Sequence, residues 1–163
     1  MPDYKSTPAI GQIDGNACWA ACSSWWLKAL GGGRPALSQM DLIVQYTRFC
    51  NDDGGMPPTY FLYNFCREPR FMMKAVLAQS AYWKDKPLPL GDRPTLMVFT
   101  YPLIGGTHMN VIFGQDKGTR KVTAMEPYHP YPGQDGKRSG TFVERSEQFY
   151  LSGPTFAMVS AST

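Results

Sequence analysis

The chain of 163 residues contains 43% hydrophobic, 13% aromatic and 18% charged residues, a composition that is typical of a globular domain and excludes a largely disordered chain. Its 16 basic and 13 acidic residues give a net charge of +3 and are scattered along the chain, which argues against a nucleic-acid partner. No apolar run approaches the roughly 20 residues that cross a bilayer, and the N-terminus lacks the basic start and apolar run of a signal peptide.

These features predict that residues 1–163 form a single soluble domain, which we expect to be a monomer without a membrane span. The protein could be cytoplasmic, be exported by a machine that reads no such signal, or be one domain of a longer chain.

Helices are predicted in the first half of the chain. The run 18–30 (CWAACSSWWLKAL) is nearly uncharged and is followed by three glycines, so we expect a buried helix that ends there. Ser38 and Asp41 have the spacing of a capping box and predict a second helix over 39–48. Residues 50–70 are predicted to be mostly loop with one short helix near 59–66, and another helix is predicted near 71–81.

Strands are predicted after the proline-rich connector KDKPLPLGDRP. Short runs rich in β-forming residues are bounded by Gly and Pro and cover 95–100, 108–113, 121–125 and 155–160. Helices therefore come first and strands second. This order favours an α+β domain in which a helical lobe packs on a small, mainly antiparallel sheet.

Cys18 is the candidate nucleophile, because it opens the helix predicted at 18–30. Unpaired N–H groups and the macrodipole at a helix N-terminus favour a thiolate, and the same N–H groups can hold the oxyanion that forms when it attacks a carbonyl. Gln12 stands six residues earlier, where its side-chain amide could supply a second oxyanion donor.

His108 is the candidate general base among only two histidines. It begins the alternating run HMNVIFG after a glycine-containing turn, so its ring should lie at the end of a rigid strand. His129 lies between prolines in EPYHPYPG and is expected on the surface. Glu126 follows the predicted strand KVTAM, which should place its carboxylate on the neighbouring strand of a hairpin, where it can orient the imidazole.

The Gln-x5-Cys-Trp element, the glycine-rich turn into His-x5-Gly and a strand that ends in an acidic residue before proline resemble the papain-like cysteine peptidases. Cys18-Trp19-Ala20-Ala21, the glycine-rich helix end and Ser38-Gln39 resemble the compact bacterial branch. That branch includes effector proteases of plant pathogens and is akin to the peptidases that process double-glycine leader peptides. The similarity covers about residues 10–48 and 93–128.

This resemblance implies a papain-like fold with Cys18 as nucleophile, His108 as base, Gln12 and Cys18 in the oxyanion hole, and Glu126 as third member of a triad. The family usually places Asn or Asp at the third position, and Glu is one methylene longer.

Neighbouring residues have plainer interpretations. Trp19 is expected to pack at the wall of the substrate cleft. Asn110 shares a strand face with His108 and either lines the cleft or serves the structure. Trp25 and Trp26 are predicted to be core residues, and so is Cys22.

The four cysteines, at positions 18, 22, 50 and 66, show no C-x-x-C spacing, so neither structural zinc nor another metal is expected. If Cys18 stays free, at most one disulfide can form, joining 22 to 50, 22 to 66 or 50 to 66. Three reduced cysteines are the plainer alternative.

Three functions are compatible with these residues. The first is a cofactor-free cysteine endopeptidase that cleaves an extended peptide through a thioester. The second is an amidase, deamidase or acyltransferase with the same Cys–His chemistry, for example on peptidoglycan. The third is a catalytically silent papain-like binding domain, against which the intact Gln-Cys-His set argues. Since no pro-segment is recognisable, we also predict a bacterial secreted effector or toxin domain, held in check by an inhibitor or immunity protein.

Overall fold

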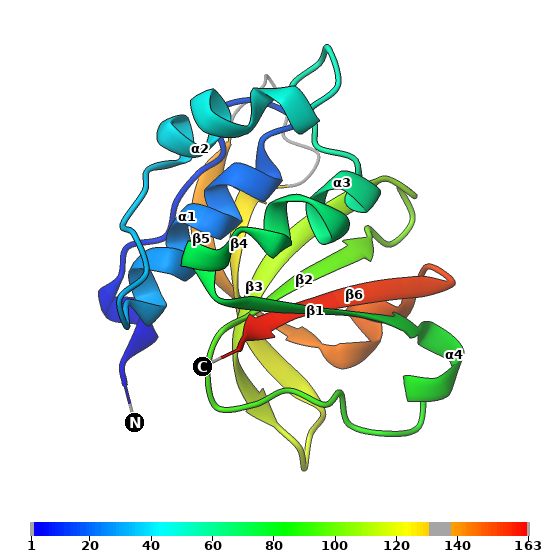
Figure 1. Ribbon diagram of the computed structural model, residues 1–163. Coiled ribbons are helices and arrows are strands. Elements are labelled where there is room, and N and C mark those ends of the chain that lie inside the picture. The colour runs from blue at the N-terminus through cyan, green and yellow to red at the C-terminus, as the bar shows by residue number, and fades with distance from the viewer. Residues whose placement is uncertain (1, 131–137, 163) are drawn as a thin grey trace.

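The computed structural model describes residues 2–130 and 138–162 and shows a helical lobe packed against an antiparallel sheet (Figure 1). The helices are α1 (Cys18–Leu30), α2 (Gln39–Tyr46), α3 (Pro58–Tyr63) and α4 (Ser80–Trp83). The strands are β1 (Met73–Gln79), β2 (Thr95–Thr100), β3 (Thr107–Asp116), β4 (Lys121–His129), β5 (Ser139–Ser146) and β6 (Thr155–Ala161), in the sheet order β1-β6-β2-β3-β4-β5. The predicted α+β architecture is confirmed.

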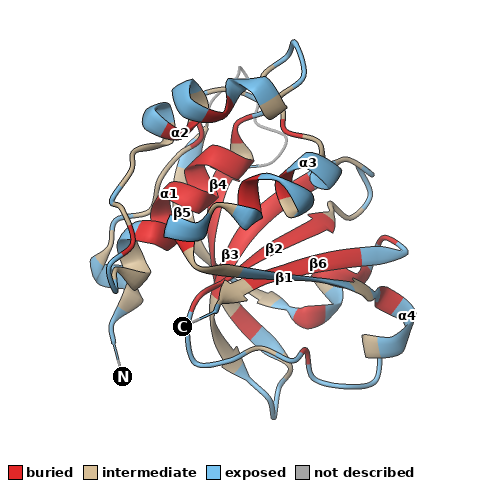
Figure 2. Ribbon diagram, in the orientation of Figure 1, coloured by how far each residue is buried: buried red, intermediate tan, exposed pale blue. Residues whose placement is uncertain are grey.

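Helix α1 is the central element of the helical lobe, with the boundaries predicted from the sequence. It packs on β3 and β4, and its residues from Trp19 to Leu27 are buried (Figure 2). The predicted core residues Trp25 and Trp26 are fully buried, and their indole N–H groups donate to Thr7 O and Pro94 O at 3.0 and 2.8 Å. Because these polar groups are satisfied, the two rings can be buried without losing hydrogen bonds.

Helix α2 begins with the capping box that the sequence predicts. Ser38 Oγ accepts from Asp41 N at 3.0 Å, and Ser38 N donates to Asp41 Oδ2 at 2.9 Å. The helix ends at Tyr46, where the chain tightens into a 3-10 turn, η2 (Thr47–Phe49). Further 3-10 turns are η1 (Tyr4–Ser6), η3 (Phe65–Arg67), η4 (Pro69–Phe71) and η6 (Glu147–Leu151).

Apolar side chains cover both faces of the sheet. One cluster lies between the sheet and the helical lobe and includes Trp25, Leu42 and Val111. The other lies on the opposite face, where Leu88 and Tyr150 pack on strands β2, β3, β4 and β6. The central strands are therefore buried on both sides, which explains why β2 is a nearly continuous buried run.

The helix predicted near 71–81 is wrong. Residues Met73–Gln79 form β1, which pairs with β6 along its whole length, from Met73 opposite Ala161 to Gln79 opposite Thr155. Only one turn of helix, α4, follows. The sequence MKAVLAQ consists mostly of good helix formers, but hydrogen bonding to β6 outweighs that weak local preference.

The sequence also failed to reveal β5, an edge strand that pairs with β4. Strands β3 and β4 extend beyond the predicted 108–113 and 121–125, so the sheet is larger than expected. The presence of β5 is important for the candidate active site, because this strand carries Arg145.

Candidate active site

Cys18 is the first residue of α1 and is half-buried. The residue before it, Ala17, makes no side-chain cap on the helix. Because the first N–H groups of an α-helix have no partner within the helix, an uncapped N-terminus leaves them available beside the thiol. Helix α1 thus places a thiol and backbone donors at the same point.

His108 lies on β3 with only 1% of its surface exposed. Its Nε2 lies 2.5 Å from Glu126 Oε2 on the neighbouring strand β4, and its ring also makes a hydrogen bond with Cys18. Since Nε2 is taken by Glu126, Nδ1 is the nitrogen left to face the thiol. The rings of Phe99 and Tyr101 pack edge-on against the imidazole and limit its rotation.

The charge state of His108 follows from these contacts. Burial acts to lower the pKa of His108, but the hydrogen bonds to Cys18 and Glu126 and their negative charges outweigh burial and raise it from 6.5 to about 9. An imidazolium is therefore favoured when the thiolate and the carboxylate flank the ring.

Glu126 is fully buried and is held at both oxygens. Oε2 accepts from His108 and, at 3.2 Å, from Tyr128 N, while Oε1 lies 2.9 Å from Arg145 Nη1. Burial acts to raise the pKa of Glu126, but the hydrogen bond and charge of His108 and the charge of Arg145 outweigh it, so the pKa is lowered. The carboxylate is consequently kept ionised inside the protein.

Arg145 is a site residue that the sequence did not reveal, because it lies on the unpredicted strand β5. The same Nη1 atom that contacts Glu126 donates to Asn110 Oδ1 at 2.6 Å. Asn110 Oδ1 also accepts from the buried Tyr150 hydroxyl at 2.9 Å. Asn110 is completely buried in this network and is not among the residues that line the cavity beside Cys18.

Gln12 is 3% exposed, and its backbone N–H donates to Pro127 O at 2.9 Å, which places it beside the strand that carries Glu126. Its side-chain Nε2 donates to Asp14 O at 2.7 Å. An amide nitrogen has two N–H groups, so one remains for another acceptor. Oε1 has no hydrogen-bond partner among the described residues.

A cavity of about 310 Å³ lies over Cys18 and His108. Trp19 lines it, and its indole N–H donates to Gly54 O at 3.2 Å, which ties the loop before α3 to the start of α1. The lining is apolar or neutral apart from the imidazole and consists of Gly15, Asn16, Cys18, Trp19, Gly55, Met56, Pro58, Phe61, Val98, Gly106, Thr107, His108 and Met109.

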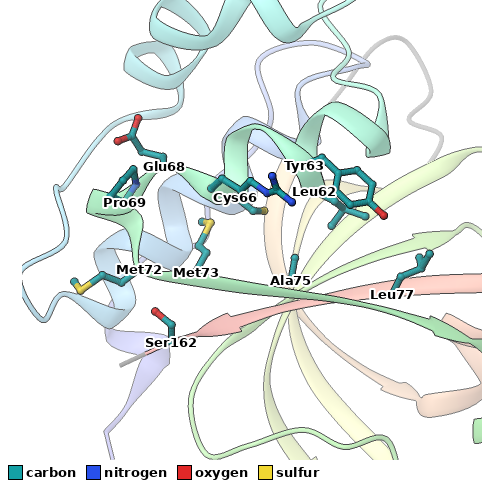
Figure 3. Close-up of a pocket in the computed structure, with 11 residues that line it drawn as sticks. Leu62, Tyr63, Cys66, Glu68, Pro69, Met72, Met73, Ala75, Leu77 and Ser162 are labelled. Atoms are coloured by element: carbon teal, nitrogen blue, oxygen red, sulfur yellow. The ribbon is translucent and has the colours of Figure 1, made fainter.

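Two further cavities continue from this one across the sheet. A small one of about 100 Å³ shares Pro58, Val98 and Thr107 with the cavity at Cys18. It shares Leu62 and Leu77 with a third cavity of about 410 Å³, which lies between α3, η3 and the edge strand β1 (Figure 3). We call this series of cavities the groove.

All four cysteines are free thiols. Cys22 and Cys66 are buried, as expected for core residues, and burial raises the pKa of both thiols. Among the described residues, no three His, Cys, Asp or Glu side chains gather as metal ligands. None of the described helices is long and apolar enough to cross a membrane.

A thiol at the start of a buried helix, beside a histidine–carboxylate pair on an antiparallel sheet, is the arrangement expected from the sequence for a papain-like fold. Among solved structures, the chain is similar to the peptidase domain of Streptococcus ComA, a bifunctional ABC transporter involved in a quorum-sensing pathway. The match has a TM-score of 0.60 at 13% identity and covers 95% of this chain and 98% of that domain. No protein-family model and no curated protein sequence matches the chain. The predicted papain-like fold is thus confirmed.

Proposed function

We propose that this protein is a cysteine peptidase in which Cys18, His108 and Glu126 act as a catalytic triad. The observation that carries the proposal is the continuous contact from the Cys18 thiol through the imidazole to a buried, ionised carboxylate, at the edge of a cavity. A nucleophile, a base and an orienting group in this order are the requirements of acyl transfer through a thioester.

The reaction begins when the proton of Cys18 Sγ passes to His108 Nδ1. The thiolate attacks the substrate carbonyl, and the oxyanion is held by N–H groups at the start of α1 and by the second N–H of Gln12. Collapse of the tetrahedral intermediate breaks the C–N bond, and the proton on Nδ1 goes to the leaving amine. Water then attacks the thioester, gives its proton to Nδ1, and the C–S bond breaks to release the acid and the thiolate.

The groove supports an extended peptide as the substrate. Gly15, Gly55 and Gly106 line the cavity at Cys18 and bring backbone groups within reach of a substrate main chain. Further along, the apolar side chains of Leu62, Leu77 and the methionines 72 and 73 line the groove beside the charged Arg67 and Glu68. Apolar substrate side chains on one side of the cleaved bond would bury their surface there.

Incubation with denatured proteins and analysis of the products by mass spectrometry tests the proposal. We expect new peptide termini with the wild type and none with Cys18→Ala, which keeps the fold but lacks the nucleophile. Cleavage that persists in Cys18→Ala, or intact substrates throughout, would reject a cysteine peptidase. A parallel incubation with purified peptidoglycan fragments tests the amidase alternative, because released stem peptides would assign the same triad to the cell wall.

The effector or toxin role is also a proposal. It predicts that expression arrests growth of a host cell and that Cys18→Ala abolishes the arrest. Harmless expression of the intact protein at high level in every compartment would contradict it.

A further inference from the structure

Arg145 occupies an unusual position for a charged side chain. The side chain is 13% exposed, and its guanidinium lies 4.1 Å from the centre of the Phe149 ring. One nitrogen reaches both Glu126 Oε1 and Asn110 Oδ1, at 2.9 and 2.6 Å. Ordering and desolvating an arginine costs free energy, so the buried position of Arg145 requires an explanation.

The charge changes of His108 during the proposed reaction provide this explanation. In the proposed reaction the imidazole alternates between a charged and a neutral state, while Glu126 stays buried beside it. When the ring is neutral, it no longer compensates the carboxylate. A buried carboxylate without a counter-charge tends to take up a proton.

Protonation of Glu126 would damage catalysis in a specific way. A neutral carboxylic acid donates its O–H to Nε2, which leaves the only ring proton on Nδ1. In that tautomer Nδ1 cannot accept the proton of Cys18, so the base is lost although every residue is still present.

We propose that Arg145 is a positioning residue that keeps Glu126 ionised and holds its Oε2 against His108 through every charge state of the imidazole. The inference rests on the proposed function. It assigns to β5 a role in the site, although this strand carries none of the triad.

The titratable or charged groups that act on Glu126 or on its neighbours come from β3, β5, α1, η6 and the residue after β2. They are His108, Arg145, Cys18, Cys22, Tyr150 and Tyr101. Within this set of described residues, Arg145 alone carries a positive charge that does not change during the reaction. The constant positive charge that compensates Glu126 therefore belongs to Arg145.

The test is the pH dependence of Cys18 alkylation by iodoacetamide, measured on the full chain. This readout needs no substrate, so it separates the inference from the question of what the protein cleaves. In Arg145→Met, a neutral side chain of similar length, we expect the acidic limb of the rate profile to move to higher pH by about one unit, the size of effect that one close counter-charge has on a carboxyl group. Arg145→Lys, which keeps the charge, should recover most of the shift.

Arg120→Met is the matched control. Arg120 also pairs with a buried glutamate, Glu147, at 3.8 Å, but neither residue contacts the triad. Its substitution should leave the acidic limb in place. An equal shift in Arg120→Met, or an unchanged limb in folded Arg145→Met, would overturn the inference.

A double variant covers the case in which Arg145→Met folds poorly. In a Glu126→Gln background there is no carboxylate charge to compensate, so adding Arg145→Met should change the alkylation profile little beyond Glu126→Gln alone. A further full shift in the double variant would show that Arg145 does not act through Glu126.

Discussion

His108 Nε2 and Glu126 Oε2 lie 2.5 Å apart although their residues are not directly opposite in the sheet. The β3–β4 register pairs Val111 with Met125, and continuing it places Asn110, not His108, opposite Glu126. His108 is therefore a diagonal neighbour of Glu126, and such neighbours are about 7–8 Å apart, with their Cβ atoms somewhat closer. The extra methylene of glutamate, compared with aspartate, helps the carboxylate to span this diagonal.

The first prediction follows from that geometry. Glu126→Asp keeps the charge but shortens the reach, so it should lower kcat/KM despite its conservative chemistry. Glu126→Ala should lower it by about 10²-fold or more, because an unoriented base loses most of its contribution. Kinetics on a peptide substrate check both, and a fully active Glu126→Asp would contradict the diagonal argument.

The second prediction concerns stability and pH. The pKa of His108 is raised to about 9 from 6.5, so the folded state holds this proton more tightly than the unfolded chain. Its contribution to the free energy of unfolding should be complete below pH 6.5 and be lost as the pH rises through about 9. Glu126, whose pKa is lowered from 4.5, has the opposite dependence and loses its contribution as the pH falls.

Urea unfolding between pH 5 and 10 measures this effect. In His108→Gln the alkaline loss of stability should be smaller than in the wild type, because the group that releases the proton is absent. A slope that is the same in both proteins would show that other groups govern the alkaline limb.

Much of this site could be predicted from the sequence because its signals are local. The start of α1 at Cys18 and the capping box of α2 follow from residue types at short spacings. Glu126 and His108 are 18 residues apart, but each lies on a segment with its own strand pattern, and a hairpin between the two segments brings them together.

The residues that were missed depend on contacts between distant segments. Arg145 lies on a strand whose sequence, SGTFVERS, has weak alternation and becomes ordered by pairing with β4. Likewise β1 has a helical composition and is a strand only because β6 pairs with it. Neither pairing leaves a pattern inside the segment itself, so no reading of these segments alone could find them.

The third prediction tests the groove as the substrate-binding surface. Leu77 is 59% exposed and lines two cavities of the groove, so Leu77→Lys should raise KM for peptides with apolar residues and leave Cys18 alkylation unchanged. The neighbouring Val76 points to the other face of β1 and is 43% exposed, which makes Val76→Lys the matched control. Equal KM values for the two variants would exclude this part of the groove from substrate binding.

The fourth prediction concerns the thiols. Cys22 and Cys66 are buried, and Cys50 is half-buried with its pKa also raised, chiefly by burial. Brief treatment of the native protein with iodoacetamide at neutral pH should therefore modify Cys18 alone, whereas all four cysteines should react in denaturant. Peptide mapping by mass spectrometry locates the modified residues. Labelling of Cys22 in the native protein would mean that α1 opens more readily than its burial indicates.

The last prediction concerns the crossing of the N-terminal segment over β5. A Cβ atom at Gly140 would lie 2.3 Å from Ile10 C and 2.6 Å from Gly11 N, both of them backbone atoms that cannot rotate away. Gly140→Ala must therefore push the segment that carries Gln12 off the sheet. We expect a loss of about 1–3 kcal/mol of stability, as in other overpacked sites.

Displacement of Gln12 gives the same substitution a second effect. If Gln12 donates to the oxyanion, Gln12→Ala should lower kcat by about 10²-fold at nearly unchanged substrate binding, and Gly140→Ala should reproduce part of that loss even where it is fully folded. Gly91→Ala is the control, because a Cβ there meets nothing within 4 Å. The double variant Gln12→Ala/Gly140→Ala then tests whether Gly140→Ala lowers kcat through Gln12. If both substitutions act through the same amide, the double variant should lose no more kcat than Gln12→Ala alone. Losses that multiply would assign the effect of Gly140→Ala to another part of the site.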